Sequence, residues 1–421
     1  ILMLPISSAK GAWTPFVDSL FTATTSVCVT GLVTVDTGSH WSLFGQVVIL
    51  LLIQIGGLGV VTLAASFMMM AGRKIGLLQR STMQDAVSAH KLDGIVRLTR
   101  FIVFGTLLIE LIGAAIMAPT FIRDFGWGRG LWFSIFHSVS AFCNAGFDLF
   151  GVIAPDASIS CMNTDPVVMG TVTALIILGG LGFFVWEEVV RQRSWKKFSV
   201  YTKLVLTTTG ILLLSGGVIF LVLEWHNPAT LGPMSVPEKI LNALFQSVTL
   251  RTAGFASIDQ GGLTEAGKAG SVGFMLIGGS SGSVAGGVKT VTVVVMLLFL
   301  WTRMRSKQTV TIYKRTIPNA KVLDAMTIIS IVAGLAVVGA VYICAVCPVG
   351  FVDALYETVS ALATVGNTTG VTRLLPVSAQ YMIIVFMYFG RVGILTLSLG
   401  FLMGDRAQER FQYAQTNLLI G

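Results

Sequence analysis

Apolar stretches of two different lengths alternate along the chain. Three are about 20 residues or longer and predict helices that cross a ~30 Å hydrocarbon core: 97–119, 200–223 and 325–344. Four shorter apolar runs each end at a glycine: 13–31, 131–146, 238–254 and 351–366. As a helix, the last of these extends only about 20 Å at ~1.5 Å per residue before its Thr-Val-Gly. We therefore expect the short runs to enter a membrane and turn back.

A further apolar run follows each short one, and we expect it to return as a helix: 43–70, 166–190, 270–301 and 379–403. Each short run closes with an approach rich in Ser and Thr, then a small or polar residue, then one glycine. These motifs recur at intervals of roughly 110 residues, which indicates internal duplication. The third motif is one residue shorter between its first serine and its glycine, so we align the glycines.

The expected fold is an all-α polytopic membrane protein, with four helix–pore loop–helix repeats around a central pore in one chain, as in potassium channels. The predicted repeats and tail are 1–72, 95–191, 199–302, 322–404 and a cytoplasmic C-terminal tail at 405–421. We expect Ile1 to Pro5 to be the end of a first helix that is truncated at the N-terminus.

The four glycine motifs are candidates for a cation filter. Irregular backbone at membrane depth is tolerated where it lines a cavity, and inward carbonyl oxygens can replace the water shell of a cation. The predicted cation filter consists of Val29, Thr30, Gly31, Asn144, Ala145, Gly146, Thr252, Ala253, Gly254, Thr364, Val365 and Gly366. We expect Arg251 to support its loop from behind. Asp148 either draws cations toward the mouth or is an exposed aspartate without a role.

The third returning run contains so many glycines that a continuous helix is not expected over 278–288, because each glycine costs about 1 kcal/mol relative to alanine. We predict that this stretch lies across the pore as a gate; a small-residue packing face is the alternative. The gate prediction includes Gly278, Gly279, Ser280, Ser281, Gly282, Ser283, Gly286, Gly287 and Arg391. In the other returning runs, close packing better explains the glycines.

Arg391 stands where the other repeats have a glycine, and a mid-span arginine usually faces a cavity or a partner. It either raises the barrier for cations, donates to carbonyl groups of the glycine-rich stretch, or pairs with a glutamate. The candidate partners are Glu110, Glu187 and Glu188.

Composition supports a membrane protein, since 54% of the 421 residues are hydrophobic and 11% are charged. The net charge of +8 comes from basic residues concentrated in the loops between repeats. By the positive-inside rule these loops are cytoplasmic and the filter loops face outward. Because the basic residues flank spans and are not interleaved with stacking aromatics, nucleic acid is not an expected partner.

The motifs resemble those of the Trk/Ktr/HKT superfamily of potassium transporters and, within it, the membrane subunits of bacterial Ktr systems. The resemblance rests on Cys28-Val29-Thr30-Gly31-Leu32, on 136–147, on 245–255 and on Gly390-Arg391-Val392-Gly393. It implies a homodimer in the bacterial inner membrane, seated on a cytoplasmic ring of RCK-type nucleotide-binding regulatory subunits. It also implies potassium uptake stimulated by sodium, which activates or is co-transported, and a gate in the third repeat. No organic cofactor is expected.

The alternatives to potassium uptake are a pore for another ion and an intramembrane enzyme. A sodium- or ammonium-conducting pore could use the same scaffold, although within the superfamily a serine at the first filter position often accompanies sodium transport, and this chain has Gly31. An intramembrane enzyme needs a paired nucleophile and base or facing carboxylates, and the sequence offers no such set. Cys344 and Cys347 form a lone C-x-x-C without a matching pair, so a zinc or redox role is not expected.

Overall fold

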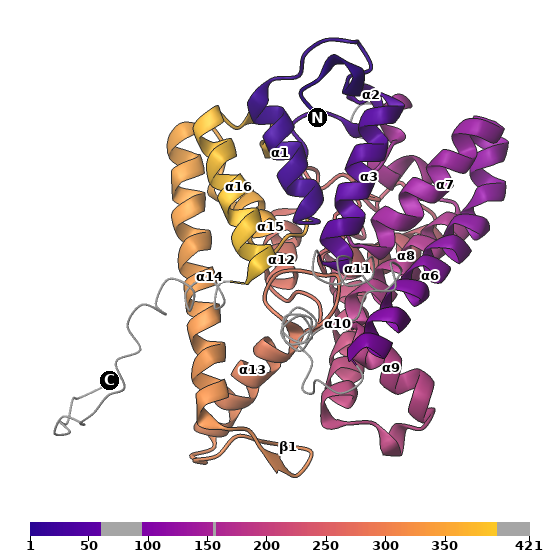
Figure 1. The fold of residues 1–421 in the computed structure, drawn as a ribbon. Helices are drawn as coiled ribbons and strands as arrows, with labels where there is room; N and C mark the ends of the chain where they lie inside the picture. Colours follow the sequence, from indigo (N-terminus) through magenta and orange to yellow (C-terminus); the bar gives the residue numbers. More distant parts are fainter. Residues whose placement is uncertain (60–94, 155–156, 394–421) are drawn as a thin grey trace.

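The computed structural model describes residues 1–59, 95–154 and 157–393 (Figure 1). The predicted tail at 405–421, and the parts of the predicted repeats at 60–72 and 394–404, lie outside the described residues. The described chain is largely helical, with a two-stranded hairpin, β1 (Thr311–Ile312) and β2 (Arg315–Thr316).

Within the described residues, three long helices are apolar enough to cross a membrane: α6 (Ile95–Phe125), α10 (Val200–Glu224) and α14 (Asn319–Val346). Their most apolar windows have a mean hydropathy of 2.2 to 2.5, and only about a third or less of each window is buried. Exposed residues such as Leu108, Leu214 and Val338 cover their outer faces. Large apolar faces open to the surroundings are typical of helices in lipid.

Four shorter helices precede the glycine motifs and lie further inside: α1 (Phe16–Val27), α7 (Trp127–Phe142), α11 (Val236–Thr249) and α15 (Phe351–Leu362). In Figure 1, α11 and α15 lie in the middle of the molecule. Local signals start two of these helices. The helix α11 begins with a capping box, in which Ser235 and Glu238 satisfy each other's backbone amides. Helix α1 begins directly after Pro15.

The returning helices are shorter than the sequence predicts. They are α3 (Leu43–Leu58), α8 (Pro166–Leu181) and α16 (Val377–Val392). Each ends at a glycine with positive φ, namely Gly59 (+82°), Gly182 (+94°) and Gly393 (+91°). After Gly182 the chain bends by 95° into α9 (Phe183–Gln192), so the prediction of one continuous helix over 166–190 is wrong. Backbone with positive φ cannot continue a right-handed helix, and glycine adopts it without a Cβ clash.

The third returning element is divided into α12 (Glu265–Met275) and α13 (Thr290–Met304). We call residues 276–289 between them the glycine-rich segment; none of these residues is helical. In Figure 1 this segment forms a loop near the centre of the molecule, between α12 and α13.

Two hydrophobic clusters pack around the central loops. The first is aromatic and centres on α6, α7 and α8, with Phe121, Phe136 and Phe150 fully buried. The second joins α1, α12, α14, α15 and α16, with Phe21 and Tyr356 fully buried. The loops are thus packed against helices from both clusters, which restricts their motion.

Candidate functional site: a ring of four glycine loops

The four glycine loops share one backbone conformation. The glycines themselves, Gly31, Gly146, Gly254 and Gly366, have φ between +67° and +97°. Two positions earlier, four residues other than glycine also have positive φ, between +50° and +64°: Val29, Asn144, Thr252 and Thr364. Positive φ is uncommon outside glycine, particularly in β-branched residues. Because positive φ recurs at the same position in each loop, the four loops have the same specific backbone turn.

The Ser and Thr residues of the approach hold this shape. In the first and fourth loops the glycine N–H donates to a hydroxyl six residues earlier, from Gly31 to Thr25 and from Gly366 to Ser360, both at 3.0 Å. In the second loop the hydroxyl of Ser140 instead donates to the carbonyl of Phe147 at 2.7 Å. The loops therefore turn because hydroxyl groups replace the helical hydrogen bonds that end there.

The third loop makes equivalent contacts with one residue fewer. The Thr249 hydroxyl donates to the Phe255 carbonyl at 2.6 Å, and the Ala253 N–H donates to the Thr249 carbonyl at 2.9 Å. Thr249 lies five residues before Gly254, whereas Ser140 lies six before Gly146. The missing residue lies ahead of Thr252, and the left-handed pair Thr252 and Gly254 is preserved.

The four glycines form a closed ring. A Cβ added to Gly31 would lie 2.6 Å from the Ala145 carbonyl oxygen, and one on Gly146 would lie 2.7 Å from that of Ala253. A Cβ on Gly254 would lie 2.6 Å from the Val365 oxygen. A Cβ on Gly366 would meet the Thr30 oxygen, which closes the circle. We call this arrangement the glycine ring.

No side chain larger than hydrogen fits at these positions, because each glycine faces the carbonyl before the next glycine. The four carbonyl oxygens belong to Thr30, Ala145, Ala253 and Val365, all of which the sequence places in the candidate filter. The ring therefore gathers main-chain oxygens from four segments of the chain at one place. Such oxygens are suitable ligands for alkali cations.

A cavity of about 340 Å³ lies above the ring, and all four glycines contribute to its lining. Three carboxylate residues, Asp36, Asp148 and Asp259, also line it, as does Arg373. Asp148 accepts a hydrogen bond from the Phe150 N–H at 3.0 Å, so its carboxylate also shapes the following turn. A hollow lined by carboxylates concentrates cations.

The glycine-rich segment packs against the other side of the fourth loop. A Cβ on Gly286 would overlap the Thr364 hydroxyl, and one on Gly287 would lie 2.8 Å from the Ala363 carbonyl. The segment is closed at its base, where the Gly278 N–H donates to the Val288 carbonyl at 2.8 Å and the Thr290 N–H to that of Gly279 at 3.0 Å.

Hydrogen bonds tie the glycine-rich segment to the second repeat. The Ser280 N–H and hydroxyl donate to the Gly180 carbonyl at 3.1 and 3.0 Å. The Phe183 N–H donates to the Gly282 carbonyl at 2.9 Å. The Tyr201 hydroxyl, from α10, donates to the Ser281 carbonyl at 2.7 Å. Because its partners lie on several helices, the segment has a defined position although it is not helical.

Arg391 donates to main-chain carbonyls of two different elements. One nitrogen bonds the Val284 carbonyl in the glycine-rich segment, and the other bonds the carbonyls of Gly56 and Gly57 at the end of α3. This agrees with the alternative in which the arginine holds the segment through its carbonyls, a role suited to the fork of guanidinium donors.

The glutamates considered as partners of Arg391 have other contacts. Glu110 accepts from Gln54 at 3.1 Å, Glu187 pairs with Arg191 at 3.2 Å, and Glu188 accepts from Ser199. The glutamate alternative for Arg391 is therefore not supported by the described contacts.

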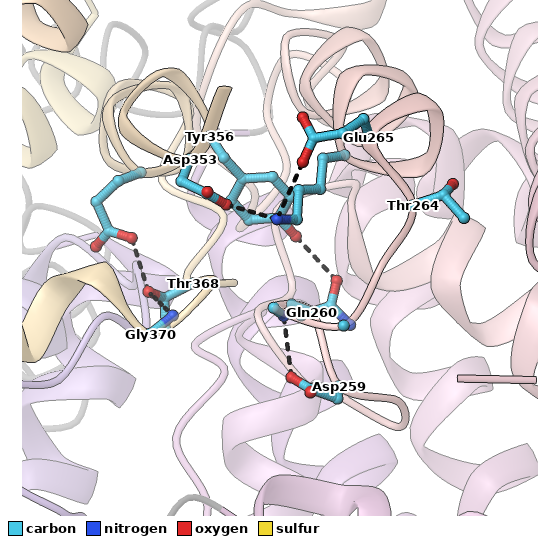
Figure 2. Close-up of polar contacts among 12 residues, drawn as sticks. Asp259, Gln260, Thr264, Glu265, Asp353, Tyr356, Thr368 and Gly370 are labelled. Atoms are coloured by element: carbon cyan, nitrogen blue, oxygen red, sulfur yellow. Dashed lines mark hydrogen bonds and ion pairs between the residues drawn. The ribbon is translucent and has the colours of Figure 1, made fainter. Parts of the chain in front are cut away.

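The outer part of the third and fourth loops is supported by a polar cluster that sequence reasoning missed. The Tyr356 hydroxyl donates to Gln260 at 2.9 Å (Figure 2). Lys268 forms an ion pair of 2.9 Å with Asp353, which links α12 to α15, and one of 3.5 Å with Glu265 on its own helix (Figure 2).

Glu357 is a buried acid beside the fourth loop. It is fully buried on α15 and accepts hydrogen bonds from Thr368 at 2.7 Å and from Thr372. Both threonines follow Gly366 closely, so Glu357 ties the outer end of the fourth loop to its own helix. A charged residue inside an otherwise apolar run was the available signal, because such residues are rarely retained at membrane depth without a role.

The other residues considered from the sequence are Arg251, His137 and the C-x-x-C cysteines. The Arg251 side chain is buried and points to Thr209 on α10, at 3.5 Å, which agrees with support from behind the third loop. His137 is fully buried, accepts from the Leu149 N–H and stacks on Phe150. Cys344 and Cys347 are free thiols, and the described part of the chain holds no group of three His, Cys, Asp or Glu residues suited to a metal.

Comparisons with known proteins agree with this architecture. The family model TrkH, described as a cation transport protein, matches residues 3–410. The potassium/sodium uptake protein NtpJ of Enterococcus hirae is 38% identical over 426 residues, which cover 100% of this chain and 93% of the relative. The Ktr system potassium uptake protein B of Bacillus subtilis is 38% identical over 412 residues, which cover 98% of this chain and 91% of the relative.

A solved structure shares the fold. The crystal structure of the potassium transporter TrkH from Vibrio parahaemolyticus matches with a TM-score of 0.69 at 18% identity, over 92% of this chain and 78% of that one. From the family match over most of its length and from these relatives, the chain belongs to the TrkH family of cation transport proteins.

Proposed function

We propose that this protein is the potassium-translocating membrane subunit of a bacterial potassium uptake system, and that potassium passes through the glycine ring. The observation that carries the proposal is the meeting of four carbonyl oxygens, from Thr30, Ala145, Ala253 and Val365, between four glycines that exclude side chains. The relatives named above are potassium or potassium/sodium uptake proteins. Because the family consists of transporters, the protein is not an enzyme.

Unsatisfied hydroxyl groups beside the ring support a cation path. The hydroxyls of Thr30, Thr252 and Thr364 are buried and have no hydrogen-bond partner among the described residues. Buried polar atoms are nearly always paired, so these oxygens are available to a passing ion or its water. The carboxylates of the cavity above the ring would raise the local cation concentration.

In the proposed mechanism the glycine-rich segment is the gate. It packs directly against Ala363 and Thr364 of the fourth loop, and Arg391 bonds it to the end of α3. Opening requires these contacts to be exchanged for others, so a regulator acts by stabilising one of the two arrangements.

Four further features belong to the proposal. The protein is a homodimer with one pore per subunit, and a cytoplasmic ring of RCK-type nucleotide-binding subunits controls the gate; the names of the Ktr relatives, as parts of a system, support additional subunits. Sodium stimulates uptake. The filter loops face outward from the bacterial plasma membrane, and the basic loops are cytoplasmic. A sodium- or ammonium-conducting pore is the alternative, because one relative is named for both potassium and sodium.

The test is ion flux through the purified protein in liposomes. Gly366→Ser places a side chain where φ is +97° and where the Thr30 oxygen leaves no room. Strain of about 1–3 kcal/mol in the ring lowers the selectivity for potassium over sodium by roughly 5- to 150-fold. Rubidium influx competed with sodium measures it. Unchanged selectivity and uptake affinity in a folded G366S protein contradict the assignment of the ring.

Gly128→Ser is the matched control, because a Cβ at Gly128 meets nothing within 4 Å. Omitting sodium and the regulatory ring, separately and together, distinguishes a regulated potassium pathway from a sodium-conducting one. A sodium flux equal to the rubidium flux in the wild-type protein favours the alternative ion.

A further inference from the structure

Five basic residues from two distant segments gather around one surface hollow. Lys196, Lys197 and Lys203 come from η4 (Trp195–Lys197) and the start of α10, whereas Lys314 and Arg315 come from the β1–β2 hairpin. The hollow has a volume of about 600 Å³, and its lining contains no acidic residue. We call it the basic hollow. In Figure 1 the hairpin, labelled β1, lies at the lower end of the molecule.

The charges of the basic hollow are not neutralised within the described chain. None of its five basic side chains forms an ion pair there; the Lys203 ammonium donates only to the Lys196 carbonyl at 3.4 Å. The nearby Glu188 accepts from the Ser199 N–H and hydroxyl, so it caps α10 and does not pair with these lysines. Five like charges around one concave surface repel one another, and a bound anion removes that repulsion.

Aromatic and membrane-crossing elements adjoin the hollow. Tyr313 and Phe198 line it, and Trp195 packs on Phe198 with ring centroids 5.9 Å apart. Trp195 and Tyr313 are each 49% exposed. Lys203 lies in the first turn of α10, one of the helices long enough to span a bilayer. Aromatic rings and basic residues at the end of a span are typical of the level of the lipid head groups.

We propose that the basic hollow binds the phosphate head group of an anionic phospholipid such as phosphatidylglycerol. The volume is that of a small-ligand site, and basic pockets between helices at this depth are suited to phosphate head groups. Both strand and helix contribute ligands, so the bound lipid links the hairpin before α14 to the start of α10. This inference depends on the proposed function in one respect, namely that the protein spans a bilayer whose head groups lie at the level of the basic hollow.

The decisive variant is K196Q/K197Q/K314Q/R315Q, made in the full chain and purified in detergent. All four side chains are exposed, so folding does not depend on their charges. Thermal unfolding is followed while short-chain phosphatidylglycerol is added. Lipid affinity falls about fivefold for each basic residue removed, so the wild-type protein is stabilised at concentrations that leave the variant unchanged.

The control variant R303Q/R305Q removes two charges that lie over the rings of Phe299 and Trp301 and do not line the hollow. We expect phosphatidylglycerol to stabilise this control variant as much as it stabilises the wild-type protein. Phosphatidylcholine and inorganic phosphate serve as the other ligands, and neither stabilises the wild-type protein at matched concentration.

Three results overturn the proposal. Equal stabilisation of the wild-type and the four-residue variant by phosphatidylglycerol places the lipid elsewhere, and equal stabilisation by inorganic phosphate makes the hollow a general anion site. If the lipid has no effect but the variant loses its regulatory subunits, the hollow is a protein interface. Rubidium flux that persists in phosphatidylcholine liposomes separates any of these failures from failure of the proposed function.

Discussion

Replacing Gly286 with alanine tests whether the glycine-rich segment obstructs the path by contact with the fourth loop. The new Cβ would overlap the Thr364 hydroxyl and lie 3.1 Å from its Cβ and 3.3 Å from its Cγ2. Thr364 is fully buried and held with φ at +50°, so it has little room to move. The glycine-rich segment must shift instead.

The size of the effect follows from overpacking, which costs about 1–3 kcal/mol in a well-packed site. If this energy destabilises the closed arrangement alone, the ratio of open to closed protein rises by roughly 5- to 150-fold. In liposomes without regulatory subunits, we expect the basal rubidium flux of G286A to exceed that of the wild-type protein by a factor in this range. Flux follows the open-to-closed ratio in this way as long as most of the protein is closed. Gly273→Ala in α12 is the control, because a Cβ there meets nothing within 4 Å.

A second substitution makes this test specific. Thr364→Ala removes the hydroxyl and the methyl group that the new Cβ meets, so G286A has a much smaller effect in a T364A background. The four proteins form a double-mutant cycle whose interaction free energy is about 1 kcal/mol or more. If G286A raises flux equally in both backgrounds, or lowers it in both, the contact between the segment and the fourth loop does not hold the gate closed.

Three further predictions concern residues around the ring. Arg391→Met leaves the Val284 carbonyl of the glycine-rich segment and the Gly56 carbonyl of α3 without a charged donor, worth about 1.5–3 kcal/mol each, so basal rubidium flux rises at least tenfold; unchanged flux would show that these bonds do not restrain the segment. Glu357→Gln weakens the bond from Thr368, and selectivity for potassium over sodium falls up to about fivefold, whereas an unaltered selectivity contradicts a tethering role. Lys268→Met leaves the partly buried Asp353 without its partner and lowers the melting temperature, and K268M/D353N partly restores it. If the double variant is no more stable than K268M, the ion pair between Lys268 and Asp353 does not stabilise the fold.

Much of the central arrangement could be predicted because it repeats. The glycine motifs recur with the same approach residues, and the structure brings Gly31, Gly146, Gly254 and Gly366 together. The excess of glycine after α12 likewise indicated non-helical backbone, since the sequence signal is local.

The ends of the returning helices could not be predicted in the same way. The glycine pairs in α3 and α8 do pack closely, since a Cβ on Gly57 would lie 2.6 Å from the Cys143 sulfur and one on Gly179 would meet Phe142. The chain nevertheless leaves the helix two or three residues later, at Gly59 and Gly182. The sequence alone does not distinguish a glycine required for close packing from a glycine required for positive φ.

Contacts between distant segments were also beyond the sequence. Glu357 and Lys268 lie in separate short helices, and nothing in their spacing predicts a common support for the third and fourth loops. The basic hollow joins residues near 200 to residues near 314, which the sequence assigned to two unrelated loops. Such groupings depend on how helices pack, and helix packing is determined by many weak contacts.

The central claim is that the carbonyl oxygens of Thr30, Ala145, Ala253 and Val365 bind the transported cation. Anomalous diffraction from crystals grown in rubidium locates that cation directly. The account predicts an anomalous peak on the axis of the glycine ring, at coordinating distance from these oxygens, which is lost when sodium replaces rubidium. Rubidium bound only away from the ring, in crystals of protein that transports it, would contradict the account.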